Sequence, residues 1–221
     1  MTRPKAILFD AGGTLVTIDP RAFGDVVEPI LGVRAAPDRM FSAHFHAMDA
    51  IRRDSDLTRS RPGSWWRWWL ERYLELAGLE PSPEAVDALA ATRGLWRHPM
   101  PGSFEGVRAV VDAGIQVGVV SNADGHVADD LAAAGFGDLF DVIVDSTVVG
   151  VSKPDPAIFG FALDRLGVSA ADTWYVGDSP LFDLGGARAA GLAEFVLIDP
   201  VGINNGYRPT VTSLTELPGL L

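Results

Sequence analysis

Residues 115–146 read IQVGVVSNADGHVADDLAAAGFGDLFDVIVDS, and this stretch carries the pattern that decides the fold. One apolar run ends in Ser121 and Asn122, a helical pattern spans 125–134, and a second apolar run ends in Asp145. Continuous apolar runs of this length are typical of strands that are buried on both faces of a parallel sheet. The stretch therefore predicts a strand–helix–strand unit with parallel strands.

The same pattern recurs on both sides of this stretch. Further apolar runs are AILFD (6–10), TWYVGD (173–178) and EFVLID (194–199), and helical patterns over 155–166 and 181–190 lie between the later runs. This repetition predicts an α/β fold with a doubly wound, mainly parallel sheet whose strands end on one edge. Ligands bind at that edge in such folds. The polar residues that follow the runs are Asp10, Ser121, Asn122, Asp145, Ser146, Asp178 and Asp199.

Residues 11–114 separate the first two apolar runs, which is far more chain than a crossover needs. Much of this span reads as helices, with one over 38–53, a second over 63–77 and a third that begins near Pro83. We therefore expect an α-helical domain of residues 16–99, inserted into a core domain of residues 1–15 and 100–221.

Composition and charge exclude several classes of protein. The 221 residues carry a formal net charge of −11, which disfavours nucleic acid and anionic membranes as partners. The chain has no cysteine, so thiolate catalysis, Cys-ligated zinc and disulfides are excluded. The N-terminal apolar run is too short for a signal peptide, and no later run approaches the roughly 20 residues of a membrane span. We expect a soluble, cytoplasmic protein.

Two of the strand ends carry groups that suit the binding of an anion or a metal. In FDAGGTL (9–15), Asp10 lies beside glycines that allow a ligand to approach the backbone, so it is a candidate nucleophile, metal ligand or both, or simply the Asx turn that ends a strand. In VVSNAD (119–124), Ser121 and the N–H groups after it precede a helix, which is typical of an anion site and also of an ordinary turn.

Two later stretches add a cation and a pair of carboxylates. Lys153 in GVSKPDP (150–156) is one of only two lysines, and it offers a point charge to a phosphate or a carboxylate. In YVGDSPLFD (175–183), Gly177 is expected to permit a turn, and Asp178 and Asp183 supply oxygen ligands of the kind that Mg²⁺ prefers.

These four stretches, in this order, resemble the four motifs of the haloacid dehalogenase-like hydrolase superfamily, and the inserted helices resemble its cap domain. The resemblance covers essentially the whole chain and implies a Rossmann-like core with a covalent aspartyl intermediate. It implies that Asp10 is the nucleophile and that Thr14 orients it. It further implies that Ser121 and the Asn122 backbone bind the phosphoryl group, and that Lys153 screens the charge between phosphate and Asp10. The implied Mg²⁺ ligands are Asp10, Asp178 and the Gly12 carbonyl, with Asp183 as their support.

By this resemblance the chain is a Mg²⁺-dependent phosphatase of a small anionic organic phosphate. One position departs from the pattern of the family's phosphatases, because Gly12 stands where they carry the aspartate that acts as general acid and base. Such a group typically contributes 10²–10⁴-fold to the rate. Candidate substitutes are His126, Asp19 and His98.

Two alternative functions stay open. The first is a catalytically impaired member that binds a phosphorylated metabolite or a protein partner. The second is a 2-haloacid dehalogenase, although Asp178 and Gly12 both argue against it, because dehalogenases of the family typically lack that carboxylate and carry an aromatic residue at the Gly12 position. A phosphonatase is excluded, since the inserted domain has no lysine to form a Schiff base.

The inserted domain has two further features. Arg52, Arg53, Arg59 and Arg61 gather near a predicted helix connection, where they are either an anion clamp or a solvated loop. Trp65, Trp69 and Tyr73 share a helix face, with Trp66 adjacent. This stripe is interpreted as core or a domain seam, with an aromatic substrate wall or a dimer patch as alternatives.

Overall fold

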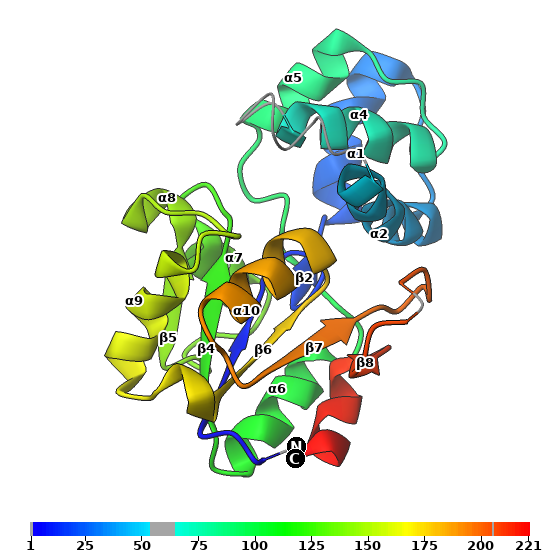
Figure 1. Cartoon of the computed structure of the whole chain (residues 1–221). Coiled ribbons are helices and arrows are strands. Elements are labelled where there is room, and N and C mark those ends of the chain that lie inside the picture. Colours follow the sequence, from blue (N-terminus) through cyan, green and yellow to red (C-terminus); the bar gives the residue numbers. More distant parts are fainter. Residues whose placement is uncertain (1, 54–64, 205) are drawn as a thin grey trace. The chain divides into compact units, whose positions relative to one another are not determined.

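The computed structural model describes residues 2–53, 65–204 and 206–221, which form two compact units (Figure 1). One unit joins Met1–Val16 with Pro99–Leu221, and the other is Thr17–His98. A short two-stranded sheet of β2 (Val16–Thr17) and β3 (His98–Pro99) contains both boundaries between the units.

The first unit is built on a parallel sheet with the strand order β5-β4-β1-β6-β7-β8. This arrangement confirms the predicted α/β class. The strands are β1 (Ala6–Phe9), β4 (Gln116–Ser121), β5 (Val142–Asp145), β6 (Thr173–Gly177), β7 (Glu194–Ile198) and β8 (Thr210–Val211). The apolar runs predicted the first five, whereas β8 has only two residues and is too short to leave a periodic signal.

Helices and turns connect these strands and cover the sheet. They are α6 (Ser103–Asp112), α7 (Val127–Ala133), α8 (Ser146–Val149), α9 (Ala157–Leu166), the 3₁₀ turn η1 (Ala170–Asp172), the π-helical turn η2 (Pro180–Leu184), α10 (Gly185–Ala189) and the 3₁₀ segment η3 (Leu214–Leu220). Leu8 and Val120 pack in one buried cluster with Phe159 of α9 and Ala187 of α10. This cluster covers one face of the sheet, and Ile7 and Phe9, which alternate with Leu8 along β1 and so point to the other face, are also fully buried, as continuous apolar strands require.

The second unit consists of four helices in the described ranges. They are α1 (Pro20–Leu31), α2 (Pro37–Arg53), α4 (Trp65–Leu76) and α5 (Pro83–Ala91). The sequence predicted the last three. Helix α1 was missed because Gly24 and Pro29 interrupt its pattern, yet Asp19 caps its first turn and Pro29 lies in its last turn, after most of its hydrogen bonds are made. No helix in the described ranges is long and apolar enough to cross a membrane.

The aromatic stripe of α4 forms the core of this helical unit. Trp69 and Tyr73 are fully buried, and their rings stack with centroids 4.9 Å apart. Trp66 also stacks on Trp69, with centroids 5.0 Å apart, and the His44 ring meets Trp69 edge-on. The core interpretation of the stripe is confirmed for Trp69 and Tyr73.

Candidate active site

The predicted site residues lie at the carboxyl edge of the sheet, around its central strand. Asp10 directly follows β1, whose two neighbours are β4 and β6. Ser121 ends β4 and Asp178 follows β6, so both lie on strands that flank Asp10. The Asp10 N–H donates to the carbonyl of Val176 on β6 at 2.8 Å, which fixes the start of the loop after β1.

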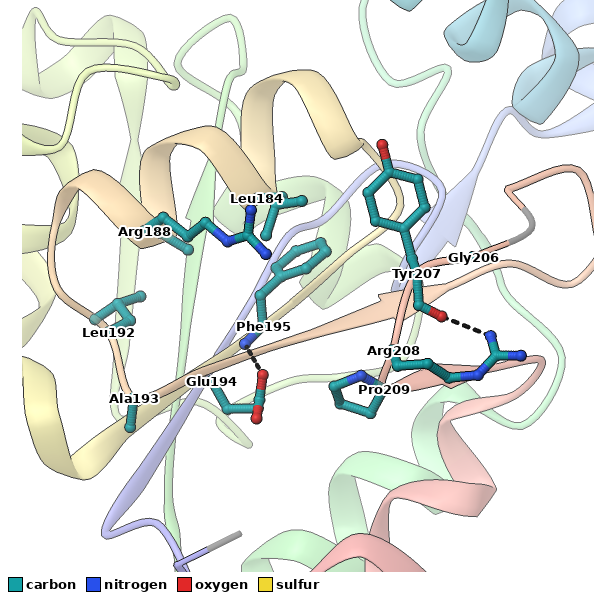
Figure 2. Close-up of a pocket in the computed structure, with 11 residues that line it drawn as sticks. Leu184, Arg188, Leu192, Ala193, Glu194, Phe195, Gly206, Tyr207, Arg208 and Pro209 are labelled. Carbon is teal, nitrogen blue, oxygen red and sulfur yellow. Dashed lines mark hydrogen bonds between the residues drawn. The ribbon is translucent and has the colours of Figure 1, made fainter.

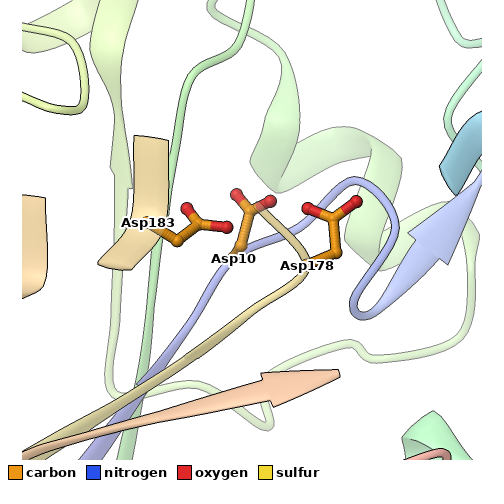
Figure 3. Close-up of side chains that lie close together, drawn as sticks. All are labelled: Asp10, Asp178 and Asp183. Atoms are coloured by element: carbon orange, nitrogen blue, oxygen red, sulfur yellow. The ribbon is translucent and has the colours of Figure 1, made fainter. Parts of the chain in front are cut away.

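Three carboxylates converge at this edge (Figure 3). Asp10, Asp178 and Asp183 each offer an oxygen, and these oxygens lie within 4.8 Å of one another. The residues are 8%, 4% and 0% exposed, so their negative charges are held together with little water to screen them. Such an arrangement is stable only when positive charge lies close by.

Lys153 supplies one positive charge. Its ammonium donates to Asp10 Oδ1 at 2.6 Å, to Asp183 Oδ1 at 2.7 Å and to the Tyr175 hydroxyl at 2.8 Å. The side chain is almost completely buried. Burial lowers the pKa of Lys153, but the two carboxylates outweigh it, so the pKa is raised and the residue keeps its charge at neutral pH.

The single lysine does not balance three carboxylates. Burial raises the pKa of Asp10 to about 7, with Lys153 opposing the rise and Asp183 and Asp178 adding to it. Burial also raises the pKa of Asp183. Fully ionised, the three carboxylates and the ammonium carry a charge of −2, which a divalent cation would cancel. The donor set of hard oxygens in a buried cluster fits Mg²⁺.

Gly12 and Thr14 lie in the loop that follows Asp10. None of the hydrogen bonds within this loop uses the Gly12 carbonyl oxygen, so that oxygen is available as a ligand. Thr14 was predicted to orient Asp10, but its buried hydroxyl has no hydrogen-bond partner among the described residues. A buried hydroxyl in this state typically costs about 1–3 kcal/mol, and it makes no hydrogen bond to Asp10.

Ser121 and Asn122 behave differently from each other. Ser121 is buried at the end of β4. The Asn122 side chain turns to the Lys153 backbone instead, accepting from the Lys153 N–H at 2.7 Å and donating to its carbonyl at 2.9 Å. The loop that follows Asn122 is held by Asp145, whose Oδ2 accepts from the Gly125 N–H at 3.0 Å. Asp145 and Ser146, which also bonds this loop, are therefore its anchors.

Tyr175 was not identified as a site residue from the sequence. It lies in the middle of β6, and its hydroxyl donates to the Val120 carbonyl at 2.8 Å while it accepts from Lys153. Burial raises the pKa of Tyr175 well above its usual range, so the hydroxyl keeps its proton. A signal was present, because a tyrosine in a strand buried on both faces needs a partner for its hydroxyl.

The expected reason for Gly177 is wrong. Gly177 ends β6 and is not among the glycines with a positive φ. A Cβ at this position would lie 2.6 Å from Cγ of Asp183, so a side chain is excluded by lack of space. The Ser179 N–H holds the same carboxylate at 2.9 Å. Gly177 therefore lets Asp183 pack against the strand beside Lys153.

Asp19, His126 and Asp199 have structural partners, and His98 is exposed. Asp19 accepts from the Arg21 N–H at 2.7 Å as the cap of α1, and His98 is exposed on β3. His126 Nδ1 lies 3.7 Å from Asp129 Oδ2. The Asp199 carboxylate accepts from the Asn204 N–H at 2.7 Å and so orders the loop after β7.

In the helical unit, the structure describes two of the four arginines named as a possible anion clamp. Arg52 and Arg53 bond the buried Asp49 carboxylate at 2.5 and 2.6 Å. These ion pairs favour a structural role for both residues. Arg59 and Arg61 lie outside the described residues.

A separate pocket of about 420 Å³ lies between α10, β7 and the segment 206–209 (Figure 2). Arg188, Phe195, Tyr207 and Arg208 line it, together with Glu194. None of the predicted site residues is part of its wall. The candidate active site is therefore defined by its converging side chains and not by this pocket.

Known proteins resemble the chain over most of its length. The sequence model of a hydrolase family, the haloacid dehalogenase-like hydrolases, matches residues 4–191. Haloacid dehalogenase-like hydrolase domain-containing protein 3 of Mus musculus is 30% identical over 207 residues, which are 90% of this chain and 80% of that protein.

Two further relatives have names that point to different reactions. The plasmid phosphoglycolate phosphatase of Cupriavidus necator is 33% identical over 165 residues, 69% of this chain and 71% of that one. The crystal structure of a dehalogenase is similar with a TM-score of 0.68 and 26% identity, over 100% of this chain and 98% of that one.

Proposed function

Because the chain belongs to the haloacid dehalogenase-like hydrolase family and is a hydrolase, we propose that it is a Mg²⁺-dependent phosphatase of a small organic phosphate, acting through an aspartyl-phosphate at Asp10. The observation that carries this proposal is the convergence of Asp10, Asp178 and Asp183 around one buried ammonium at the carboxyl edge of the sheet. The similarity to a phosphoglycolate phosphatase supports the reaction class.

The reaction takes place in two steps. Asp10 attacks phosphorus, its new O–P bond forms as the ester P–O bond breaks, and the alcohol leaves with a proton from solvent. Water then attacks the aspartyl-phosphate, which releases inorganic phosphate and restores the carboxylate. Lys153 holds Asp10 Oδ1 throughout, and the Ser121 hydroxyl and the Asn122 N–H bind phosphoryl oxygens. Phosphoryl transfer depends mainly on such positioning and charge neutralisation.

Three groups of this chain would hold Mg²⁺: the carboxylates of Asp10 and Asp178 and the carbonyl oxygen of Gly12. Asp183 supports them through Lys153. The bound ion supplies positive charge that offsets the repulsion between the carboxylates and a phosphate anion.

Gly12 makes the second step the slow one, because no side chain at this position takes a proton from water. Rapid mixing with p-nitrophenyl phosphate and Mg²⁺ tests this directly, since nitrophenolate needs no proton to leave. We expect a burst of about one nitrophenolate per active site, followed by slow turnover. Asp10→Asn is the matched control and should give no burst. No release by the wild-type protein at any Mg²⁺ concentration would contradict the proposal.

A second candidate is displacement of halide from a 2-halo acid by Asp10, which the similarity to a dehalogenase structure favours. It predicts halide release without any metal. Asp178 argues against it, because that reaction has no use for a metal-ligating carboxylate. A third candidate is an impaired member that binds a phosphorylated metabolite or a partner, and it predicts Mg²⁺-dependent binding of phosphate esters with neither burst nor turnover.

A further inference from the structure

Lys153 lies in the turn before α9 and is held at two points by side chains that are distant in the sequence. Asn122, at the end of β4, bonds its main chain, and Tyr175 of β6 bonds its ammonium. We propose that Asn122 and Tyr175 are positioning residues, which together fix Lys153 against Asp10 for attack on phosphorus. This inference rests on the proposed function and assigns to the Asn122 side chain a role distinct from phosphate binding by its N–H.

The Asn122 side-chain amide forms hydrogen bonds with both the N–H and the carbonyl of Lys153. Its Oδ1 accepts from the Lys153 N–H at 2.7 Å, and its Nδ2 donates to the Lys153 carbonyl at 2.9 Å. The two residues are 31 positions apart, so the pair ties two separate loops together. These two hydrogen bonds fix the position and the orientation of the Lys153 main chain relative to the end of β4.

The Tyr175 hydroxyl fixes the other end of the lysine. It has one hydrogen and two acceptors within reach, the Val120 carbonyl at 2.8 Å and Asp183 Oδ1 at 3.3 Å, and the shorter contact makes Val120 the main acceptor. Its oxygen then has a defined lone pair that accepts from Lys153 Nζ at 2.8 Å. Because Val120 belongs to β4 and Tyr175 to β6, the hydroxyl is anchored by strands on both sides of β1.

An ammonium has three N–H bonds, and all three of Lys153 point to protein acceptors. Two go to the carboxylates of Asp10 and Asp183, and the third goes to Tyr175. Without the hydroxyl, the third N–H is free to turn toward another acceptor and draw Nζ away from Asp10. Misplacement of a reacting group by about 1 Å can cost 10²-fold in rate, so the third bond matters for catalysis.

The composition of the chain allows a direct test that needs no turnover. Lys5 and Lys153 are the only lysines, so a protein labelled with ¹⁵N-lysine gives two backbone amide signals and two ammonium signals. In Asn122→Ala, the Lys153 amide proton should move upfield and exchange faster, while the Lys5 amide is unchanged. In Tyr175→Phe, the Lys153 ammonium should exchange faster while its backbone amide stays in place.

A matched control is available in the other unit. Tyr73 is also fully buried, but its hydroxyl has no hydrogen-bond partner in the described part of the chain, so Tyr73→Phe makes the same chemical change without breaking a bond. It should leave both lysine signals unchanged. Unchanged Lys153 signals in both Asn122→Ala and Tyr175→Phe would overturn the inference, whether or not the protein is a phosphatase.

The kinetic test uses the nitrophenolate burst. Asn122→Ala and Tyr175→Phe should each slow the burst by roughly tenfold or more, with the substrate concentration for half-saturation changed less than about twofold. In a Lys153→Met background, the same changes should have almost no further effect, since the residue that they position is gone. Equal effects in both backgrounds, or a change confined to half-saturation, would overturn a positioning role. Absence of any nitrophenolate release by the wild-type protein would count against the proposed function, and the lysine signals would still decide the inference.

Discussion

Asp10→Asn should stabilise the metal-free protein at neutral pH and should lose this advantage in acid. The reason is the environment of the carboxylate, which is 8% exposed and shares its surroundings with Asp178 and Asp183. Burial raises its pKa in the folded protein to about 7, from an ordinary value of 3.8. An amide at this position resembles the protonated acid at every pH, and its Oδ1 can still accept from Lys153.

The magnitude follows from linkage between protonation and folding. A carboxyl group whose pKa is raised by folding contributes most to stability below its unfolded-state pKa, and this contribution is lost as the pH rises through the folded-state pKa. The difference between 3.8 and about 7 corresponds to a loss of roughly 4 kcal/mol between pH 4 and pH 8. The variant cannot titrate here, so the gap between variant and wild type should widen by that amount.

Urea unfolding of both proteins in EDTA, at intervals from pH 4 to pH 8, measures this gap. Titrating groups far from Asp10 affect both proteins alike and cancel in the difference, whereas Asp183, whose charge interacts with that of Asp10, contributes to it. Added Mg²⁺ should then stabilise the wild type more than the variant, because the variant lacks one carboxylate ligand. A difference in the free energy of unfolding that stays constant within about 1 kcal/mol across this pH range would refute the reasoning.

Three further predictions concern stability and charge. Gly177→Ala should lower the free energy of unfolding by about 1–3 kcal/mol in urea titrations, since the new Cβ would overlap the Asp183 carboxylate. Gly160→Ala in α9 is the control and should be neutral or stabilising, because a Cβ there would have no atom within 4 Å; equal effects of the two changes would refute the packing argument. Tyr73→Phe should raise the free energy of unfolding by about 1 kcal/mol, and with it the urea midpoint, because it removes a buried hydroxyl that has no partner among the described residues. A loss of stability would show that this hydroxyl makes a hydrogen bond. Lys153→Met should lower stability by about 3–5 kcal/mol at pH 8 and by less at pH 5, where Asp10 is largely protonated, and a loss independent of pH would contradict its pairing with Asp10.

The backbone of the catalytic unit could be predicted because its strands are buried on both faces, so that each gives a continuous apolar run that ends in a polar residue. Three of these ends also bear candidate residues, which allowed Asp10, Ser121 and Asp178 to be placed at one edge from the sequence alone. Helix α1 escaped prediction since Gly24 and Pro29 weaken its local signal while packing and the Asp19 cap sustain it.

The partners within the site could not be predicted, because they arise from contacts between residues far apart in the sequence; the buried Tyr175 indicates only that its hydroxyl needs a partner, not which one. Asn122 and Lys153 are 31 positions apart, and Tyr175 is 22 positions from Lys153. The role of Gly177 depends on the Asp183 side chain, which folds back onto β6. The motifs therefore indicated which residues belong to the site, whereas the role of each residue depends on contacts that only the tertiary structure shows.

The central claim, that Asp10 is the nucleophile, is tested most directly by trapping the covalent intermediate. The protein is mixed with p-nitrophenyl phosphate and Mg²⁺, quenched in acid during the burst, treated with borohydride and digested for mass spectrometry. We expect the aspartyl-phosphate to be reduced, so that homoserine replaces aspartate at position 10 in the wild-type protein and in no sample without substrate. Release of nitrophenolate with an unmodified Asp10, or with the modification on another carboxylate, would contradict the account.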